Sequence, residues 1–404
     1  MNPLLDIEEA LQRVLGQIQP LGTETLPLPQ LLQRVLAENV LADADVPAFD
    51  RSAMDGIALR AEDGALELQL AGESAAGSPF LGQLLPGQYV RVMTGGVVPN
   101  AANAVVPVER LEKLADQKVR ILDAVRPEQH IARQGSEIRA GAVVLRAGQR
   151  LTAARLGVLA TYGRAQALVS RQPQVAMVPT GNEIVPVQSQ PKLGQVRDAN
   201  RHALTGLMQA MGAQVTQHPV ALDEKNALKL ALQTAWEKAD VLVTSGGVSA
   251  GDYDLVPPVL QELGATAHFH QIAIKPGKPL LFATREHQGK RQFAFGLPGN
   301  PVSSYVCCLL FVLPALAALQ GQTATWQTLN LPVLRALPKT GPRAEMLPAR
   351  LVQTAEGTRV EVSLLSSSAD LTRFAEADWL AWRPAHASTL EAGQPVTLMS
   401  WPRP

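Results

Sequence analysis

The alternation of apolar strand patterns with helical patterns between residues 173 and 322 is the feature that most constrains the fold. Strand-like apolar runs occupy residues 174–178, 240–244, 280–283 and 292–296, and helical patterns occupy about 200–211, 255–263 and the stretch that begins at Pro301. Strands that are apolar throughout are typical of a parallel sheet that helices cover on both faces. The segment therefore predicts an α/β domain built on a parallel sheet.

The flanking segments predict different structures. Residues 4–18 have the apolar spacing of a helix, which ends at Pro20, and a second helix with Thr152 as its N-cap extends to Tyr162. Between residues 50 and 145, short apolar runs alternate with Gly, Pro, Asn and Asp, as in a small β-rich unit. Beyond about residue 330 the short apolar runs return, broken by prolines, and predict a second β-rich domain.

Composition excludes several classes of function. The chain has 36 basic and 36 acidic side chains, so it lacks the basic excess of a nucleic-acid-binding protein. No run reaches the roughly 18 uninterrupted apolar residues of a membrane helix, and no basic segment precedes an apolar one at the N-terminus, as a secretory signal requires. Cys307 and Cys308 are adjacent, which favours neither a disulfide nor a zinc site. We therefore expect a cytoplasmic protein without nucleic-acid or membrane partners.

Three polar loops that contain glycine directly follow three of the expected strands. These loops are Thr180–Glu183, Ser245–Asp252 and Leu297–Ser304. The carboxyl ends of parallel strands open on one edge of a sheet, where ligands bind. We therefore expect the three loops to meet at one crevice.

The loop Ser245–Asp252 has the features of an anion-binding turn. Gly246, Gly247 and Gly251 allow backbone N–H groups to approach an anion closely, and the helix that follows adds its positive end. An ordinary glycine-rich turn between a strand and a helix explains the pattern equally well. No Gly-Lys-Ser or Gly-Lys-Thr follows, so the loop is not a P-loop.

Two later motifs add candidates for anion binding. Lys275 and Lys278 flank a Pro-Gly turn, so both ammonium groups can face one anion, although a solvated basic turn has the same pattern. Asn300 and Pro301 have the N-cap and N1 pattern of a helix, and Ser303 lies in its first turn. Simple helix capping is the alternative for this second motif.

Acidic side chains are expected near the same edge of the sheet. They are Glu183, Asp198, Asp223 and Asp252. Carboxylates beside bound phosphates usually hold a bridging Mg²⁺, because they otherwise repel the phosphates. Helix capping is the alternative for Asp198 and Asp223, and we favour it for Asp223.

Two motifs outside the α/β segment complete a pattern that resembles a known family. Asp55 is the penultimate residue of the polar stretch FDRSAMDG, where a simple turn is the alternative, and Thr94 lies in the glycine-rich stretch VRVMTGG. With PTGNEI, QVRDANR, DVLVTSGGVSAGDYD, AIKPGKP and LPGNPVSS, they occur in family order over about residues 47–304. Together the motifs resemble the molybdopterin molybdotransferase family, the MoeA-type proteins of molybdenum cofactor synthesis.

The resemblance implies a multidomain α/β architecture. Residues 1–49 and 141–172 would form an elongated helical base, and residues 50–140 an inserted β-rich domain. Residues 173–322 would form a MogA-like α/β domain that binds molybdopterin, and residues 323–404 a C-terminal β-barrel. The family also implies an elongated homodimer, in which the second domain of one subunit lies near the α/β crevice of the other.

The resemblance further implies an activity and roles for residues. The family inserts molybdate into adenylylated molybdopterin with Mg²⁺, releasing AMP and the molybdenum cofactor, and a molybdopterin adenylyltransferase would supply the substrate. Lys275 and Lys278 would hold molybdate, and Asp198 and Asp252 the metal. Asp55, Thr94, Glu183 and Asp223 match positions important for activity, the first two acting from the partner subunit. Binding of the nucleotide or pterin phosphate is implied for Ser245, Gly246, Gly247, Ser249, Gly251, Pro298, Gly299, Asn300 and Ser303.

The sequence departs from the family pattern at a few positions. Ile57 stands where the family commonly has tyrosine, and an arginine expected a few residues after Arg343 is replaced near Pro348. Arg350 is the candidate to replace that arginine from a shifted position. The serine-rich stretch 366–368 aligns only loosely, so the fourth domain is the poorest match.

Two other functions fit parts of the sequence. A molybdopterin adenylyltransferase resembles the α/β domain alone, but FDRSAMDG and VRVMTGG belong to the larger family and disfavour it. A non-catalytic assembly scaffold on the same fold would not need Asp55, Lys275 and Lys278, and their retention disfavours that alternative.

Overall fold

The computed structural model describes residues 4–248, 254–323, 326–365, 367 and 369–400, which belong to two compact units. Unit 1 comprises Met1–Glu38, Ala147–Thr152 and Gln166–Pro404, and unit 2 comprises Asn39–Arg146 and Ala153–Ala165. The residues expected to form the helical base, 1–49 and 141–172, fall partly in each unit. The four domain boundaries stay a prediction.

A mixed sheet forms the centre of unit 1, with the strand order β16-β13-β17-β21-β20-β18. The strands β16, β13, β17 and β21 are parallel, and the apolar sequences of β13, β17 and β21 are buried, so the α/β prediction is confirmed. The bounds are β13 Gln174–Pro179, β16 Gln214–Gln217, β17 Val241–Ser245, β18 Thr266–Gln271, β20 Pro279–His287 and β21 Lys290–Leu297.

The predicted parallel direction is wrong for β20, which contains the strand expected at residues 280–283, and β18 was not among the expected strands. Strand β20 runs antiparallel to β21, and β18 runs antiparallel to β20. Between β20 and β21, Gln288 and Gly289 have φ angles of 50° and 74°. Two consecutive left-handed residues are typical of a tight hairpin turn, which folds the chain back beside itself. Strands joined in this way must be antiparallel.

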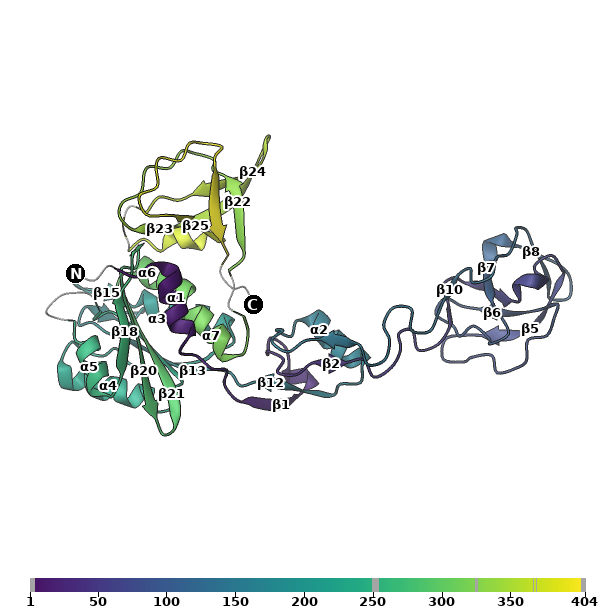
Figure 1. Cartoon of the computed structure of the whole chain (residues 1–404), viewed down its shortest axis with the longest axis horizontal. Helices are drawn as coiled ribbons and strands as arrows, with labels where there is room; N and C mark the ends of the chain where they lie inside the picture. Colours follow the sequence, from purple (N-terminus) through teal and green to yellow (C-terminus); the bar gives the residue numbers. More distant parts are fainter. Residues whose placement is uncertain (1–3, 249–253, 324–325, 366, 368, 401–404) are drawn as a thin grey trace. The chain divides into compact units, whose positions relative to one another are not determined.

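Helices cover both faces of this sheet (Figure 1). On one face lie α4 (Lys225–Trp236) and α5 (Val256–Glu262), and on the other lie α1 (Ile7–Leu15), α3 (Ala199–Ala210) and the segment Pro301–Leu319. Successive residues of a strand face opposite layers, so Val241 and Val243 pack in one core and Leu242 in the other.

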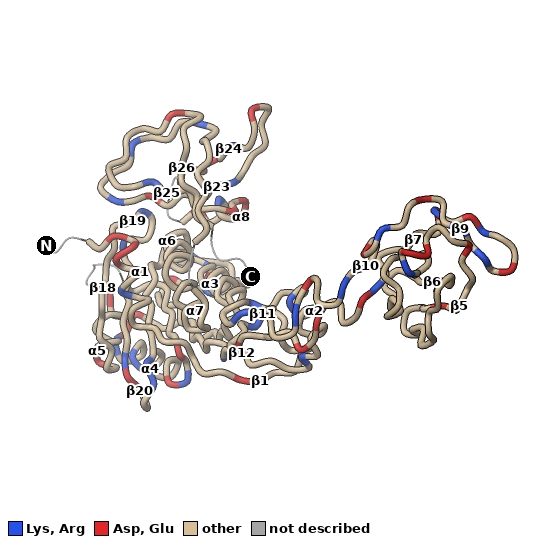
Figure 2. Tube along the Cα trace, turned by 45° about the vertical axis from the view of Figure 1, so that its right-hand side comes forward, with Lys and Arg blue, Asp and Glu red and all other residues tan. Residues whose placement is uncertain are grey.

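The apolar helix Pro301–Leu319 is a core element of unit 1. It consists of α6 (Pro301–Cys307), a π-helical turn (Cys308–Val312) and α7 (Leu313–Leu319). Pro314 lies just after the π turn; it has no backbone N–H and cannot donate the regular helical hydrogen bond to the carbonyl four residues earlier. The whole helix is free of charged side chains and is tan throughout in Figure 2.

The helix contains no uninterrupted apolar run of membrane-spanning length, but its mean hydropathy is as high as that of a membrane helix. Among the described residues, Pro301–Leu319 is the helix long and apolar enough to cross a membrane, with a mean hydropathy of 2.2 over its apolar window. Of that window, 89% is buried inside the protein. The helix therefore buries its apolar surface against the sheet, as core helices do.

The C-terminal part of unit 1 forms a second sheet with the order β19-β23-β25-β26-β22, and β24 also pairs with β23. Strand β19 (Ile274–Lys275) comes from the α/β segment and pairs in parallel with β23, so the two sheets are joined. Buried Val333, Leu347, Val360 and Leu398 form part of the core of this domain. The other bounds are β22 Thr328–Pro332, β23 Ala344–Thr354, β24 Gly357–Val362, α8 Thr372–Ala375, β25 Trp379–Arg383 and β26 Pro395–Met399.

Short elements complete unit 1. Strand β1 (Thr23–Pro27) pairs with β12 (Gln166–Ser170), and β14 (Ile184–Val185) pairs with β15 (Val196–Arg197). A 3₁₀ turn, η1, spans Leu28–Gln30.

Unit 2 contains a β-rich sheet with the order β7-β4-β6-β5-β9-β8. Ile57, which stands in place of the family's tyrosine, is a core residue of this sheet and is 3% exposed. The bounds are β2 Val40–Leu41, β3 Arg51–Ser52, β4 Gly56–Leu59, η2 Ala61–Asp63, β5 Leu68–Ser74, β6 Gln88–Val92, β7 Ala104–Pro107, η3 Val108–Arg110, β8 Leu111–Lys113, β9 Lys118–Ile121, β10 Ile131–Ala132, β11 Val143–Leu145 and α2 Ala153–Thr161.

Strands β4 and β7 approach each other so closely at Gly56 that a larger residue does not fit there. A Cβ atom on Gly56 would lie 2.1 Å from the carbonyl oxygen of Val106 on the neighbouring strand β7. We predict that Gly56→Ala destabilises unit 2 by about 2 kcal/mol or more, since the β4–β7 ladder must open to admit the methyl group. Chemical denaturation followed by circular dichroism measures the change.

Gly157→Ala is the matched control for this prediction. Gly157 lies in α2 of the same unit, and its added Cβ would meet no atom within 4 Å. We expect this substitution to leave stability unchanged or to raise it by up to about 1 kcal/mol through helix propensity. Equal stabilities for the two variants would contradict the steric account of Gly56.

Candidate functional site

A cavity of about 680 Å³ lies at the carboxyl ends of β13, β17 and β21. The three loops expected to converge all contribute to its lining, together with the start of α3. Ser249, Gly251 and Asp252 lie outside the described residues. Of the predicted site residues, the lining contains Glu183, Asp198, Asp223, Ser245, Gly246, Gly247, Pro298, Gly299, Asn300 and Ser303. We call this space the strand-end cavity.

Backbone hydrogen bonds hold the three loops together. Thr180 N donates to Ser245 O at 2.9 Å, and Gly246 N donates to Leu297 O at 2.9 Å. Gly246 has a φ of 99°, and a Cβ there would lie 2.6 Å from Thr180 O, so the close approach requires glycine. The N–H of Gly246 is therefore committed to the scaffold, which differs from the expected role of this group in binding a phosphate.

Asn200 is a site residue that the sequence analysis did not single out. Its Nδ2 donates to Gly299 O at 2.8 Å, and Ser304 Oγ donates to its Oδ1 at 3.2 Å. Asn200 is 9% exposed and thus ties the start of α3 to the loop before α6. The sequence feature that could have identified Asn200 is its position in the motif QVRDANR, in the first turn of a predicted helix.

The acidic residues divide between capping and cavity lining. Asp198 caps α3: its Oδ1 accepts from Arg201 N at 3.0 Å, and its Oδ2 lies 2.8 Å from Arg201 Nε. This matches the capping alternative for Asp198, whose carboxylate also borders the strand-end cavity.

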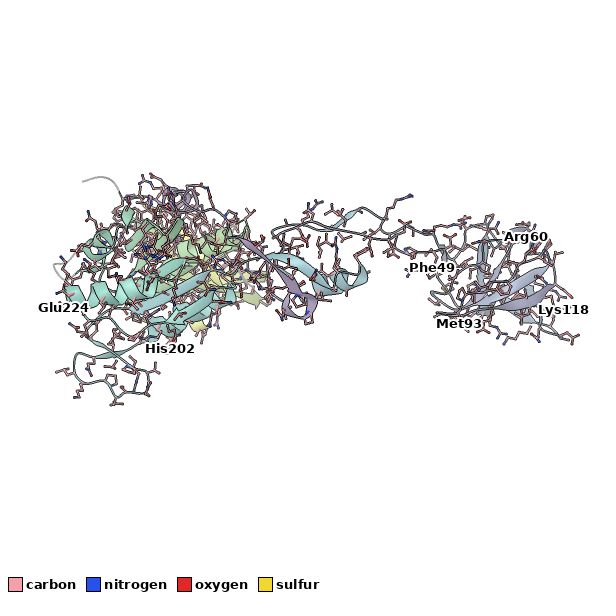
Figure 3. All side chains as sticks on the ribbon, turned by 90° about the horizontal axis from the view of Figure 1, so that it is seen from below. Phe49, Arg60, Met93, Lys118, His202 and Glu224 are labelled. Carbon is pink, nitrogen blue, oxygen red and sulfur yellow. The ribbon has the colours of Figure 1, made fainter. Side chains whose placement is uncertain are left out.

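The expectation that Asp223 caps the next helix is wrong. Glu224 is the cap of α4 and accepts from Asn226 N at 3.1 Å and Ala227 N at 3.0 Å; Figure 3 labels it at the start of that helix. Asp223 precedes the cap by one residue and instead exchanges two 3.2 Å hydrogen bonds with Asn182. This exchange holds Asp223 beside the loop that follows β13.

A second cavity of about 580 Å³ adjoins the first and shares Pro279 and Ser303 with it. Both predicted oxyanion ligands, Lys275 and Lys278, line it. The C-terminal domain adds Lys339, Arg343 and Glu345, which the sequence analysis did not include in the site. We call this space the lysine cavity.

Arg350 does not contribute to the lining of the lysine cavity. Its guanidinium pairs with Glu361 at 2.7 Å and with Glu376 at 3.6 Å. Arg343, by contrast, lines the cavity and donates to Ile274 O at 3.3 Å. The C-terminal cations at the cavity are therefore Lys339 and Arg343 rather than Arg350.

The Pro-Gly turn between the two lysines packs on the core helix. Gly277 has a φ of 112°, and a Cβ there would lie 2.7 Å from Cys307 Sγ. The thiol of Cys307 donates to Gly277 O at 3.4 Å. Burial raises the pKa of both Cys307 and Cys308, so the two thiols stay protonated and act as packing groups.

The two adjoining cavities have opposite charge. Among its described residues, the lining of the strand-end cavity contains four carboxylates and one guanidinium. The carboxylates are those of Glu183, Asp198, Asp223 and Asp254, and the guanidinium is that of Arg197. The lysine cavity has the reverse balance, with Lys275, Lys278, Lys339 and Arg343 against Glu345. A bare oxyanion is therefore attracted to the second space, and a phosphate needs a cation to enter the first.

Asp55 and Thr94 lie together in unit 2. One oxygen of Asp55, Oδ1, accepts from Thr94 N at 2.6 Å and from Thr94 Oγ1 at 2.9 Å. The backbone bond, followed by the hydroxyl bond, lowers the pKa of Asp55 below its usual value. Exposed apolar side chains near these residues in sequence are Phe49, Met54 and Met93, the first and last of which Figure 3 labels.

Family models match three consecutive parts of the chain. Residues 5–163 match the MoeA N-terminal region (domains I and II), residues 176–318 a probable molybdopterin binding domain, and residues 330–401 the MoeA C-terminal region (domain IV). A molybdopterin molybdenumtransferase of Haemophilus influenzae is 37% identical over 322 residues, which cover 79% of this chain and 78% of that protein. The protein of the same name from Staphylococcus aureus is 31% identical over 98% of this chain and 96% of its own length.

Solved structures agree with these matches. A molybdopterin biosynthesis MoeA protein from Pyrococcus horikoshii superposes with a TM-score of 0.85 at 28% identity, covering 99% of this chain and all of the other. Another structure of a MoeA protein from that organism gives a TM-score of 0.81 at 31% identity, covering 98% of this chain and 99% of that one.

The bonds between Asp55 and Thr94 generate a prediction about acid titration. Because the pKa of Asp55 is lowered in the folded protein, the bonds stabilise the fold above the ordinary carboxyl pKa. That stabilisation is lost as the pH falls through the lowered pKa. We predict that Thr94→Ala raises the pKa of Asp55 part of the way toward its usual value, since the backbone bond remains. Carboxyl ¹³C chemical shifts of Asp55 against pH measure it.

Thr94→Ser is the control, because it keeps the hydroxyl donor. We expect the titration midpoint of Asp55 in this variant to match that of the unsubstituted protein. A midpoint in Thr94→Ala that does not rise would mean that the hydroxyl bond is absent in solution.

Proposed function

The chain belongs to the MoeA family of molybdopterin molybdenumtransferases, and on this premise we propose that it inserts molybdate into adenylylated molybdopterin with release of AMP. It is thus an enzyme of molybdenum cofactor biosynthesis. The family matches extend over the segments on both sides of the molybdopterin binding domain, so a stand-alone adenylyltransferase is not favoured.

The observation that carries this proposal is the pair of adjoining cavities with opposite charge. The reaction brings together a large phosphorylated substrate and a small dianion. A cavity of about 680 Å³ is of the size that holds a nucleotide-like ligand. The adjoining lysine cavity concentrates cations, and Ser303 and Pro279 border both spaces. This arrangement supports a site where an oxyanion is held beside a bound phosphate ester.

Each group of residues then has a chemical task in the proposed reaction. Lys275 and Lys278 bind and orient molybdate, with Lys339 and Arg343 adding positive charge from the C-terminal domain. The loops around Ser245 and Gly299 hold the nucleotide or pterin phosphate. Asn200 keeps the loop before α6 in place through its bond to Gly299 O.

We also propose that Mg²⁺ enters the strand-end cavity with the substrate. The described residues contain no group of three or more His, Cys, Asp or Glu side chains that could hold a metal by itself. Mg²⁺ needs only one or two carboxylates when substrate phosphates complete its shell. Asp198 borders the cavity and could supply one carboxylate by giving up its contact with Arg201. Asp252, the second carboxylate that the family resemblance implies, lies outside the described residues. The excess of carboxylates in the cavity lining favours a cation. When bound, Mg²⁺ would neutralise phosphate charge.

Further parts of the proposal concern partners and location. We propose that a molybdopterin adenylyltransferase supplies the substrate, because adenylylated molybdopterin is the product of such an enzyme. We propose that both proteins act in the cytoplasm, since free thiols such as the buried Cys307 and Cys308 fit a reducing compartment. Fractionation of cells that express the tagged chain tests the location.

Release of AMP tests the proposed reaction directly. Purified protein is mixed with adenylylated molybdopterin, Mg²⁺ and low molybdate, and AMP is quantified by chromatography. We predict that Lys278→Met lowers the rate about 10- to 100-fold at low molybdate, because a charge-assisted contact to the dianion is lost. Raising the molybdate concentration should restore part of the rate.

Lys290→Met is the control for loss of a positive charge. Lys290 is the first residue of β21, next to the hairpin turn and at the opposite end of the strand from the strand-end cavity, and it lines neither cavity. We expect it to release AMP at the unsubstituted rate. Absence of AMP release by the unsubstituted protein under these conditions would overturn the proposed function.

We propose that the protein is a homodimer and that Asp55 and Thr94 serve the site of the partner subunit. Co-expression of an Asp55→Asn chain with a Lys275→Met chain tests this arrangement. A mixed dimer has one site that carries both substitutions and one site that carries neither. We therefore predict recovery of about a quarter of the normal rate from two chains that are each inactive alone. A mixture that stays inactive, or a chain that is monomeric by light scattering, would contradict the proposal.

A further inference from the structure

Glu345 is an acidic side chain in an otherwise basic cavity, and it contacts a residue of the proposed oxyanion site. Strand β19 pairs in parallel with β23, and the register places Lys275 opposite Glu345. The two side chains meet there, with Lys275 Nζ 3.0 Å from Glu345 Oε1. The lysine side chain is 62% exposed, whereas the glutamate side chain is 12% exposed. The carboxylate is therefore the fixed member of the pair.

Two arginines near Glu345, Arg383 and Arg343, donate to backbone carbonyl oxygens and form no ion pair with it. On the far side of β23, Arg383 is the register neighbour of Glu345, but its guanidinium donates to the carbonyl oxygens of Pro338 and Ser388. Arg343 donates to Ile274 O, which fastens β23 to β19. Among the described residues, Lys275 is the ion-pair partner of Glu345. A carboxylate with so little exposure depends on that pairing to offset its lost hydration.

From this contact we infer that Glu345 is a resident counter-ion of the oxyanion site, which competes with the bound dianion for Lys275. An arriving dianion can use Lys275 only by sharing the ammonium group with a carboxylate that repels it. Glu345 therefore weakens dianion binding and speeds dianion release. It is a positioning residue that acts through Lys275. The inference rests on the proposed function in taking Lys275 as an oxyanion ligand and molybdate as the dianion.

Removal of the negative charge at position 345 should strengthen binding. We expect Glu345→Gln to lower the dissociation constant for molybdate about tenfold, because a like charge a few ångströms from a dianion is removed. The same gain is expected for sulfate, since the effect depends on charge. Isothermal titration of the full chain with each anion, without molybdopterin, measures it. A structural defect would weaken binding, so the direction of the change separates the two explanations.

Three further variants complete the test. Glu345→Asp keeps the charge and should bind molybdate with an affinity near that of the unsubstituted chain. Glu361→Gln removes a carboxylate of the same domain that pairs with Arg350, and should change nothing. In the Lys275→Met background, the gain from Glu345→Gln should shrink, because the competition for that ammonium is gone. If Glu345→Gln does not fold, Glu345→Met provides the same test.

The outcomes separate this inference from the proposed function. Unchanged or weaker binding of molybdate and sulfate by Glu345→Gln would overturn the inference, even if the unsubstituted chain releases AMP. Full additivity of the substitutions at positions 275 and 345 would also overturn it, because the route through Lys275 would be absent. Tighter anion binding in a chain that never releases AMP would support the counter-ion and refute the transferase reaction.

Discussion

The parallel pairing of β19 with β23 is the interaction on which the arrangement of the site depends. It joins Ile274 to Ala344 and Lys275 to Glu345, residues about 70 positions apart in the chain. A two-residue strand contributes few hydrogen bonds, but Arg343 and the N–H of Ala344 add contacts to Ile274 O and Ala273 O. Through this pairing the C-terminal sheet incorporates a strand from the α/β segment. Together with the packing of Met346 and Phe374 in the main core, this pairing fixes the C-terminal cations of the lysine cavity relative to Lys275 and Lys278.

The first turn of the apolar helix Pro301–Leu319 borders both cavities. Its first turn presents Ser303 to the two spaces, and Asn300 at its start lines the strand-end cavity. One turn further on, Cys307 packs against Gly277 so closely that no side chain fits there. The remainder of the helix is buried in the main core. The position of the lysine turn relative to the strand-end loops is therefore set by a rigid, fully packed element, as an enzyme that must hold two reactants side by side requires.

Local patterns in the sequence predict the elements of the α/β segment well, but they do not predict which residues far apart in the chain pair with each other. The strand-end loops converge as expected because the parallel strands β13, β17 and β21 are apolar and unambiguous. The strand β20 was expected, but its antiparallel direction was not, because Gln288-Gly289 is a weak hairpin signal, although its φ angles are those of a tight turn. Asp223 was taken as a cap because aspartate is a better cap than glutamate in general, yet Glu224 occupies the residue next to the helix. Glu345 and Lys339 could not be found, since β19 is too short to show any periodicity.

The absence of the expected arginine near Pro348 is explained by the alternation of side chains along β23. Residues that line the lysine cavity, Arg343, Glu345 and Leu347, alternate with residues that face the other side of the strand. Pro348 belongs to that other side and is buried, and Arg350, two residues further on the same side, pairs with Glu361. Neither position contributes to the cavity in this chain. Its positive charge from the C-terminal domain comes from Lys339 and Arg343 instead, so the departure from the family pattern leaves the cationic character of the cavity intact.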